Sequence, residues 1–252
     1  ICRGLSYLHL KDTVRAYDNF NTAIRTNREN PNGYNRRGGL YMEQKRYPEA
    51  EADFNKAIEC DSTYLLSYFN RALVYSNTNR PMLALSDFDK VIQLDSTNSL
   101  TYFNRAMLRT QIGDYNRALE DYDKVALYSP NNVLVYYNRA GVYAQLGEIE
   151  KAAEDYTSAI KLYPDFAKVA EEEGFPEIAN AFKQISKVEA EHERRYLKLL
   201  SRITDGNFFK RDGKIWWQCR NCGFICEAEE APKICPACQH PQAYFEPKKD
   251  NY

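Results

Sequence analysis

The sequence lacks the features that mark several common functional classes. Its 34 basic and 35 acidic residues nearly cancel, which argues against a protein whose main task is to neutralise a nucleic-acid backbone. No apolar stretch approaches the roughly 20 residues that a membrane-spanning helix needs. No Ser-His-Asp set, phosphate-binding loop or dinucleotide fingerprint stands out. We therefore expect neither a nucleic-acid partner nor a membrane partner.

The N-terminus carries no recognisable targeting signal. The chain starts at Ile1 without an initiator methionine, and no basic-then-apolar signal segment follows. We expect a mature form or a fragment, because the first repeat unit described below lacks the start of its first helix.

The seven cysteines are unevenly distributed along the chain. Cys2 and Cys60 stand alone, whereas the other five lie within residues 219–238. An odd total placed in this way does not fit a secreted disulfide framework. It indicates a local metal site, and thiol ligands favour a reducing compartment, so we expect a cytoplasmic protein.

A period of 34 residues fills the first two-thirds of the chain. The pentapeptides that begin at Tyr68, Tyr102 and Tyr136 share the pattern Tyr-(Phe/Tyr)-Asn-Arg-Ala. The small residues in the same phase are Ala16, Ala50, Ala84, Ala118 and Ala152, and the aromatic residues four positions later are Phe20, Phe54, Phe88, Tyr122 and Tyr156. Such self-similarity indicates units that cannot bury their apolar faces alone and must stack.

This pattern resembles the tetratricopeptide repeat, a helix–turn–helix unit of 34 residues. The resemblance covers about residues 1–165 in five units, of which the first is truncated, and it implies an α-solenoid with a groove that binds a protein or peptide. The chain departs from the family pattern at one position, where arginine replaces leucine. These residues are Arg3, Arg37, Arg71, Arg105 and Arg139. We expect their stems to lie on apolar surface and their charged heads to stay in water.

The resemblance implies that the first helix of each unit lines the groove. The candidate lining residues are Asn35, Phe69, Leu73, Phe103, Met107 and Tyr137. They are mostly apolar or aromatic and include no lysine-rich clamp for a terminal carboxylate. The hypothesis is therefore an extended, partly apolar peptide ligand. The alternative is that the aromatic residues only pack between units.

The repeat pattern stops near residue 167. We expect a short helix over 165–173 that ends at Gly174. From Pro176, apolar residues at intervals of three and four predict a long helix over about 177–205 that ends at Gly206. The exposed apolar stripe of this helix predicts either a homodimer or docking on the repeats.

Two members of that stripe are polar, Glu189 and His192. They are three residues apart and so project from the same helix face. A buried carboxylate needs a partner, and one such partner is a metal, because Glu-x-x-His helices supply ligands in di-iron bundles. From the spacing alone, a Glu–His pair at a half-exposed edge is favoured over a metal site.

Four C-terminal cysteines form two C-x-x-C pairs. Cys219 and Cys222 are separated by twelve residues from Cys235 and Cys238, a spacing typical of four thiolates around one tetrahedral ion. So small a module needs a metal to fold. The spacing alone does not choose between iron and zinc.

The residues around these cysteines predict a small core. The aromatic side chains expected to cover the sulfur atoms are Trp216, Trp217, Phe224, Tyr244 and Phe245. Cys226 is expected to be a free thiol on the hairpin. His240 is expected at the surface, because four sulfur atoms already saturate a tetrahedral ion.

Residues from about Tyr163 to Tyr252 together resemble the C-terminal half of a rubrerythrin. The strings that carry the resemblance are YPDFA (163–167), EEEGF (171–175), EAEHE (189–193), CRNCG (219–223) and CPAC (235–238). Rubrerythrins are non-haem iron proteins that reduce hydrogen peroxide. They combine a four-helix di-iron bundle with a rubredoxin-like iron centre.

The resemblance implies that the four cysteines bind one iron ion, with zinc as the alternative. It also implies that Glu189 and His192 derive from a di-iron site. The repeats, however, occupy the place of the first three bundle helices, and two expected glutamates fall at Asp155 and Ser158. A complete di-iron centre in this chain is therefore not expected.

Together these features predict a mainly α protein with three domains. Repeats span residues 1–165, a rubrerythrin-like helical segment spans 166–206, and a small rubredoxin-like β metal domain spans 207–252. The first functional hypothesis is a one-iron electron-transfer centre on a protein-binding repeat scaffold, with a separate redox partner protein. The alternatives are an interaction scaffold with a structural zinc ribbon, and a peroxide reductase whose di-iron site another chain completes. Enzymatic activity therefore stays open.

Overall fold

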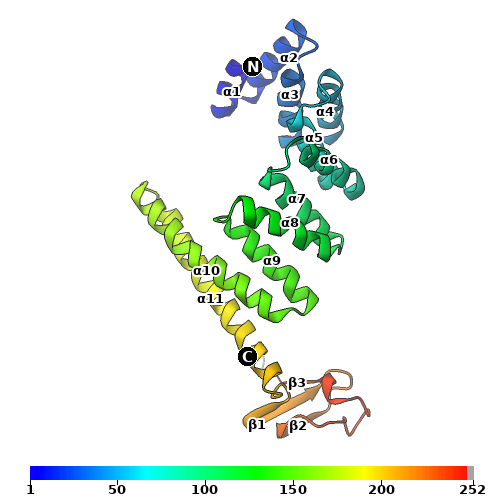
Figure 1. Cartoon of the computed structure of the whole chain (residues 1–252), viewed down its shortest axis with the longest axis vertical. Coiled ribbons are helices and arrows are strands. Elements are labelled where there is room, and N and C mark those ends of the chain that lie inside the picture. Colours follow the sequence, from blue (N-terminus) through cyan, green and yellow to red (C-terminus); the bar gives the residue numbers. More distant parts are fainter. Residues whose placement is uncertain (249–252) are drawn as a thin grey trace. The chain divides into compact units, whose positions relative to one another are not determined.

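The protein is described from a computed structural model that covers residues 1–248 (Figure 1). The fold is mainly α-helical, with a small antiparallel sheet near the C-terminus. The chain divides into two compact units, residues 1–146 and the residues from Gly147 onward. No helix within residues 1–248 combines the length and apolar character needed to cross a membrane.

The first unit is a series of helix pairs, as the 34-residue period predicts. Its helices are α1 (Cys2–His9), α2 (Thr13–Thr26), α3 (Pro31–Glu43), α4 (Tyr47–Cys60), α5 (Leu65–Asn77), α6 (Pro81–Leu94), α7 (Ser99–Gln111), α8 (Tyr115–Tyr128) and α9 (Val133–Leu146). Each pair from α1/α2 to α7/α8 packs closely along its length (Figure 1). The periodic small and aromatic residues, such as Ala84 and Phe88 of α6, are fully or almost fully buried.

A recurring turn separates the two helices of each pair. The residue in the turn has a positive φ at Lys11 (57°), Lys45 (58°), Asn79 (56°) and Gly113 (81°). The next backbone N–H donates to a carbonyl five residues back, as from Arg46 to Tyr41 at 2.8 Å. This left-handed closure satisfies carbonyls at the helix end and turns the chain into the second helix.

The arginine at the family's leucine position is paired in the units of Arg37, Arg71 and Arg105, so the expectation of a solvated head is wrong there, whereas Arg3 is exposed. Arg71 Nε and Nη2 donate to the two carboxylate oxygens of Asp87 at 2.8 and 2.7 Å, and Nη1 donates to Asn55 Oδ1 at 2.6 Å. Asp87 is buried on α6, whereas Asn55 lies on α4 of the preceding pair. One guanidinium therefore links three helices. The equivalent sets are Arg37 with Asp53 and Asn21, and Arg105 with Asp121 and Asp89.

Aromatic rings complete the arginine environment. The Arg71 guanidinium lies 5.5 Å from the Tyr68 ring and 5.7 Å from the Tyr75 ring. The hydrogen bonds to Asp87 raise the pKa of Arg71 above its ordinary value. Because two-point hydrogen bonding and ring stacking both suit a planar guanidinium, lysine would not replace arginine here.

The second unit starts with two long helices, α10 (Ile149–Glu172) and α11 (Pro176–Thr204). The expected short helix over 165–173 is absent, because α10 continues through Pro164. A proline inside a helix costs about 3 kcal/mol, but α11 packs against α10 on both sides of it. Tyr156 stacks on Tyr196 with ring centroids 5.2 Å apart, and Phe166 contacts Phe182 at 5.7 Å.

The predicted end of the repeats at residue 165 thus falls inside one continuous helix. The early residues of α10, Ala152, Tyr156 and Ala159, follow the repeat pattern and are buried. The later part forms a hairpin with α11. Gly174, with a φ of 82°, ends α10 as expected, and the Phe175 N–H donates to the Ala170 carbonyl at 2.8 Å.

The second unit ends in a three-stranded antiparallel sheet. Its strands are β1 (Lys210–Cys219), β2 (Ile225–Glu230) and β3 (Phe245–Pro247), in the order β2-β1-β3. A single 3-10 turn, η1 (Gln242–Tyr244), precedes β3. The central strand β1 ends at the first cysteine of the first C-x-x-C pair.

The buried arginine–aspartate pairs predict a large effect of removing one partner. We expect Asp87→Ala to lower the free energy of unfolding by about 3 kcal/mol, because Arg71 keeps its charge in a mostly buried place. Adding Arg71→Leu should restore much of the loss. Glu59→Ala, which removes an exposed partner of Lys56, is the control and should change little. Urea unfolding of all four proteins checks this, and equal losses in the Asp87 and Glu59 variants would contradict it.

Candidate functional site

The two C-x-x-C pairs adopt the same local backbone. The Gly223 N–H donates to the Cys219 carbonyl at 2.8 Å, and the Gln239 N–H donates to the Cys235 carbonyl at 2.9 Å. Gly223 and Gln239 both have positive φ values, of 76° and 59°. These tight turns bring the two sulfur atoms of each pair to the same side of the backbone.

A second matched hydrogen bond closes each turn. The backbone N–H of Cys219 donates to the Phe224 carbonyl, and that of Cys235 donates to the His240 carbonyl, both at 2.8 Å. The two turns are therefore pseudo-symmetric, although one contains glycine and the other glutamine at the left-handed position. They face each other at one end of the sheet.

The four sulfur atoms converge on one point. The Sγ atoms of Cys219 and Cys238 are 3.7 Å apart, those of Cys222 and Cys235 are 3.6 Å apart, and all four lie within 4.8 Å of one another. A tetrahedral ion with metal–sulfur distances of about 2.3 Å requires sulfur atoms about 3.8 Å apart. The four side chains therefore fit a single tetrahedral metal ion.

The sulfur atoms differ in exposure and in acidity. Cys219 and Cys235 are buried, Cys238 is half-buried and Cys222 is exposed. The His240 backbone N–H is the main cause that lowers the pKa of Cys238 to about 6. The Phe224 N–H acts in the same direction on Cys222, but neighbouring sulfur atoms, Cys238 first, raise the pKa of Cys222 to about 12. One thiol of the cluster thus loses its proton readily. Deprotonation of the other thiols is unfavourable unless a cation is bound.

The core beside the sulfur atoms is smaller than predicted. Trp217 is fully buried and Phe245 almost so, and both contact the cysteines as expected, with Phe224 partly buried against them. Trp216 is 50% exposed and Tyr244 is also exposed, so neither belongs to this core. Successive side chains of a strand point to opposite faces, which explains why Trp216 and Trp217 differ.

Cys226 and His240 lie close to the centre but outside the sulfur set. Cys226 is half-buried on β2 opposite Trp217, and burial is the main cause that raises the pKa of its thiol. His240 is half-buried, not fully at the surface as predicted. Its Nδ1 lies 3.1 Å from the Cys238 carbonyl oxygen, and its ring lies 4.5 Å from the Tyr244 ring.

Glu189 and His192 form a pair on α11. Glu189 is buried, with 5% of its surface exposed, and its Oε2 lies 3.1 Å from His192 Nδ1. The His192 ring meets the Tyr156 ring edge-on at 5.8 Å. Within the described residues, the four cysteines are the one set of three or more His, Cys, Asp or Glu side chains whose ligand atoms converge. The carboxylate is thus held by the imidazole.

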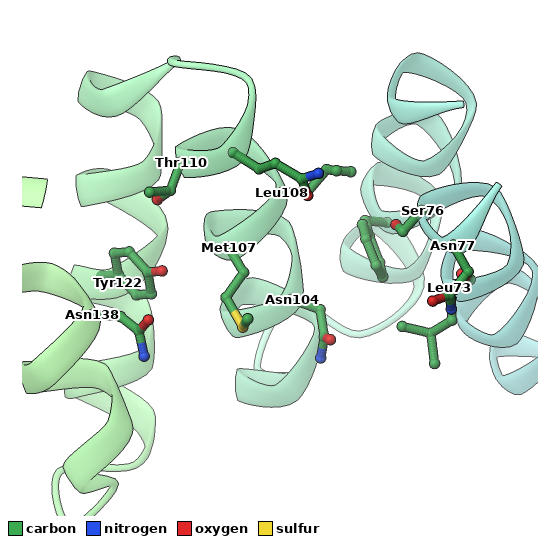
Figure 2. A pocket seen from close by; sticks show the side chains of 11 residues that line it. Leu73, Ser76, Asn77, Asn104, Met107, Leu108, Thr110, Tyr122 and Asn138 are labelled. Atoms are coloured by element: carbon green, nitrogen blue, oxygen red, sulfur yellow. Dashed lines mark hydrogen bonds between the residues drawn. The ribbon is translucent and has the colours of Figure 1, made fainter. Parts of the chain in front are cut away.

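A hollow of about 510 Å³ lies in the first unit between α5, α7 and α9 (Figure 2). It is lined by Leu73, Ser76, Asn77, Phe88, Asn104, Met107, Leu108, Thr110, Gln111, Tyr122 and Asn138. Leu73 and Met107 are the two predicted groove residues in this lining. Figure 2 shows Met107 between Asn104 and Asn138.

The other predicted groove residues lie elsewhere. Phe69 contacts Phe88 at 5.9 Å, and Phe103 contacts Tyr122 at 6.1 Å, so both rings pack inside their own helix pairs, α5/α6 and α7/α8. Asn35 is buried and accepts a hydrogen bond from Ser67 Oγ at 3.0 Å. Tyr137 is 39% exposed and outside the lining of this hollow.

Sequence reasoning missed the amide side chains of the hollow. Asn77, Asn104 and Asn138 each donate from Nδ2 to a carbonyl four residues earlier in their own helix, at 2.7–2.8 Å. These bonds orient each amide, and no lining residue carries a formal charge. For Asn104 and Asn138, the asparagine repeated in the Tyr-(Phe/Tyr)-Asn-Arg-Ala pattern was the available signal, whereas Asn77 lies outside that pattern.

Models of two protein families match this chain. Tetratricopeptide repeat models match residues 31–64 and 54–86. The "Rubrerythrin" model matches residues 108–212, and the "Rubrerythrin, rubredoxin-like domain" model matches 217–246. The chain joins tetratricopeptide repeats to a rubrerythrin-type C-terminal part. The rubrerythrin match begins in α7, earlier than the predicted start at Tyr163.

Curated relatives match only part of the chain. A rubrerythrin of Porphyromonas gingivalis is 66% identical over 91 residues, which are 36% of this chain and 46% of that protein. A rubrerythrin of Clostridium perfringens is 57% identical over 91 residues, 36% of this chain and 47% of that protein. The chain therefore spans about half the length of the curated relatives it matches.

Solved structures support the repeat fold. MamA aligns with a TM-score of 0.62 at 18% identity and covers 66% of this chain and 96% of MamA. YrrB, described as a tetratricopeptide repeat protein with an unusual peptide-binding site, aligns with a TM-score of 0.55 at 23% identity. That alignment covers 64% of this chain and 84% of YrrB. At these identities the likeness concerns the fold alone.

The geometry predicts different roles for two neighbouring cysteines. Cys222→Ser should reduce the bound metal to well under half an ion per chain, because it removes one of four thiolate ligands. Cys226→Ser, the matched control, should retain one ion per chain. Elemental analysis of the purified chains measures both. Full metal content in Cys222→Ser, or equal loss in both variants, would contradict the assignment.

Proposed function

We propose that this chain is a one-iron electron-transfer protein whose repeats hold a partner protein or peptide. The observation that carries the proposal is the convergence of four cysteine sulfur atoms in a domain that matches the rubredoxin-like model. When bound there, iron would supply a one-electron couple that needs little rearrangement.

The residues of the chain would tune and protect this centre. The backbone N–H groups of Phe224 and His240 act to lower the pKa values of the Cys222 and Cys238 thiols. Backbone dipoles of this kind stabilise negative charge on sulfur, which is greater in the reduced state, so they favour reduction. Trp217 and Phe245 keep water from the buried cysteines.

The exposed edge of the cluster indicates where an electron would pass. Cys222 is exposed and Cys238 half-buried, whereas the other two ligands are enclosed. A redox partner protein could therefore approach closest to the ion at Cys222. The electron donor and the electron acceptor would both be redox proteins that reach this edge.

Two alternatives use the same residues differently. Zinc suits four thiolates equally well, and would make the domain purely structural. A peroxide reductase would need further ligands from another chain, because Glu189 and His192 supply only two. The Glu189–His192 hydrogen bond satisfies the buried carboxylate without iron, and so favours electron transfer over this third function.

The metal and its redox behaviour separate these functions. We expect the chain from iron-supplied cells to be red, with one iron bound and a reversible one-electron reduction. The Cys222→Ser variant should lose the colour, whereas Cys226→Ser should keep it. A colourless chain with one zinc ion would contradict the proposal. Two further iron ions with peroxide turnover would favour the third function instead.

We infer that the hollow in the repeats holds an extended, uncharged peptide with apolar side chains. Leu73 and Met107 offer apolar surface, and the oriented amides of Asn104 and Asn138 offer hydrogen bonds to a peptide backbone. Neighbouring repeats lie about 10 Å apart, which is about three residues of extended chain. The two amides could thus contact one peptide at intervals of three residues.

Methionine substitutions test this groove. Peptides selected against the full chain from mixed libraries should be predominantly uncharged. Met107→Glu should weaken their binding at least tenfold, because it buries a charge against an apolar ligand. Met82→Glu is the control, because Met82 is 71% exposed and outside the hollow. Fluorescence titration compares the two, and equal affinities would contradict the assigned groove.

A further inference from the structure

The start of strand β1 forms an irregular segment that follows the end of helix α11. β1 advances five positions from Lys210 to Ile215. Over the same stretch β2 moves only two positions, from Glu230 to Ala228, so β1 carries three extra residues. Bulges of this kind redirect side chains and are frequent beside functional sites. The side chain that this bulge redirects is that of Arg211.

The Arg211 guanidinium is held in a fixed orientation. Its central carbon lies 5.0 Å from the centre of the Trp217 ring, which is a cation–π contact. Its Nη1 donates to the backbone carbonyls of Phe208 and Lys210 at 3.0 and 2.6 Å. These contacts use one face and one nitrogen of the group. The edge formed by Nε and Nη2 has no hydrogen-bond partner within residues 1–248, and neither of these atoms is fully buried.

The repeats show what the same guanidinium edge binds in this protein. At Arg71, Nη1 donates to the neutral amide oxygen of Asn55, while Nε and Nη2 donate to the two carboxylate oxygens of Asp87. Arg211 likewise uses Nη1 for neutral oxygen atoms, and presents its Nε–Nη2 edge to the outside. Because a planar guanidinium binds carboxylate and phosphate groups through two parallel hydrogen bonds, this edge fits an oxyanion.

A second arginine adds positive charge at this place. Arg202 lies in the last turn of α11, and its carbonyl accepts the Asn207 N–H at 2.8 Å, which turns the chain toward β1. Burial, and then the charge of Arg202, lower the pKa of Arg211. Neither arginine has an ion-pair partner in the described part of the chain, and Asp205 instead accepts a hydrogen bond from Ser201 Oγ at 3.0 Å. Two cations without a counter-charge attract an anion.

We propose that Arg202 and Arg211 form a binding site for a carboxylate in an acidic segment of a partner protein. Arg211 would hold the carboxylate through Nε and Nη2, and Arg202 would add attraction from the end of α11. The site is separate from the four-cysteine cluster and from the uncharged hollow in the repeats. Trp217, which carries Arg211, belongs to the same small core as Cys219 and Cys235, so the acidic segment would be held beside the metal domain.

The two tryptophans of the chain allow a direct test. The full chain is loaded with zinc and labelled with 15N-tryptophan, so that the spectrum contains one indole N–H signal for each ring and does not depend on the natural metal. A terminally blocked hexaglutamate peptide, added at low ionic strength, should shift the Trp217 signal until it saturates, because this ring lies against Arg211. Trp216 lies on the opposite face of β1 and should shift much less.

Arginine substitutions make the result specific. Arg211→Gln should weaken peptide binding at least tenfold, because it removes two charge-assisted hydrogen bonds. Arg202→Gln should weaken it about threefold by removing the second charge. Arg194→Gln is the matched control, because it removes the same charge from an exposed arginine of α11 that pairs with Glu191, and it should leave the affinity unchanged.

Three results would overturn the proposal. The first is the absence of a saturable Trp217 shift at peptide concentrations up to about 20 mM. The second is an equal affinity in the wild type and in Arg202→Gln, a comparison that decides the matter even if Arg211→Gln disturbs the fold. The third is tighter binding of inorganic phosphate than of the peptide, which would indicate a phosphate-bearing ligand in place of an acidic protein segment.

Discussion

Four cysteine sulfur atoms held within 4.8 Å of one another can all be thiolates only if a cation lies among them. The opposite pKa changes of Cys238 and Cys222 are the expected sign of this crowding. The sheet contributes only a small core around Trp217 and Phe245. So small a domain depends on its metal both for stability and for any chemistry it performs.

The repeats answer a similar electrostatic problem with protein groups alone. Arg71, at a position where the family has leucine, brings a charge between three helices, and Asp87 neutralises it with two hydrogen bonds. The same arginine–aspartate pairing recurs at Arg37 and Arg105. The stability of the stacked repeats therefore depends on matched charges as well as on buried apolar area. The hollow beside Met107, in contrast, is free of charge, which suits a neutral peptide.

Sequence reasoning succeeded where a signal is local or periodic. The 34-residue period predicts the helix pairs, the spacing of Cys219 and Cys222 predicts a metal-binding turn, and Gly174 predicts the end of a helix. It failed where tertiary contacts decide the outcome. A separate short helix over 165–173 was expected, but contacts of Tyr156 and Phe166 with α11 keep α10 continuous.

Other features were not predicted because they depend on contacts between residues far apart in the sequence. The aspartates at 53, 87 and 121 recur 16 residues after the arginines, yet only the packing of two helices brings them together. The difference between Trp216 and Trp217 depends on which strand face meets the sulfur atoms. The places of Phe69 and Phe103 depend on helix rotation, which a 34-residue period does not determine.

X-ray absorption at the iron edge of the purified full chain tests the central claim most directly. The account predicts a single iron environment with four sulfur neighbours at about 2.3 Å, unchanged in ligand number on reduction. Nitrogen or oxygen neighbours around the iron would contradict it. So would a sample without an iron edge that absorbs at the zinc edge instead.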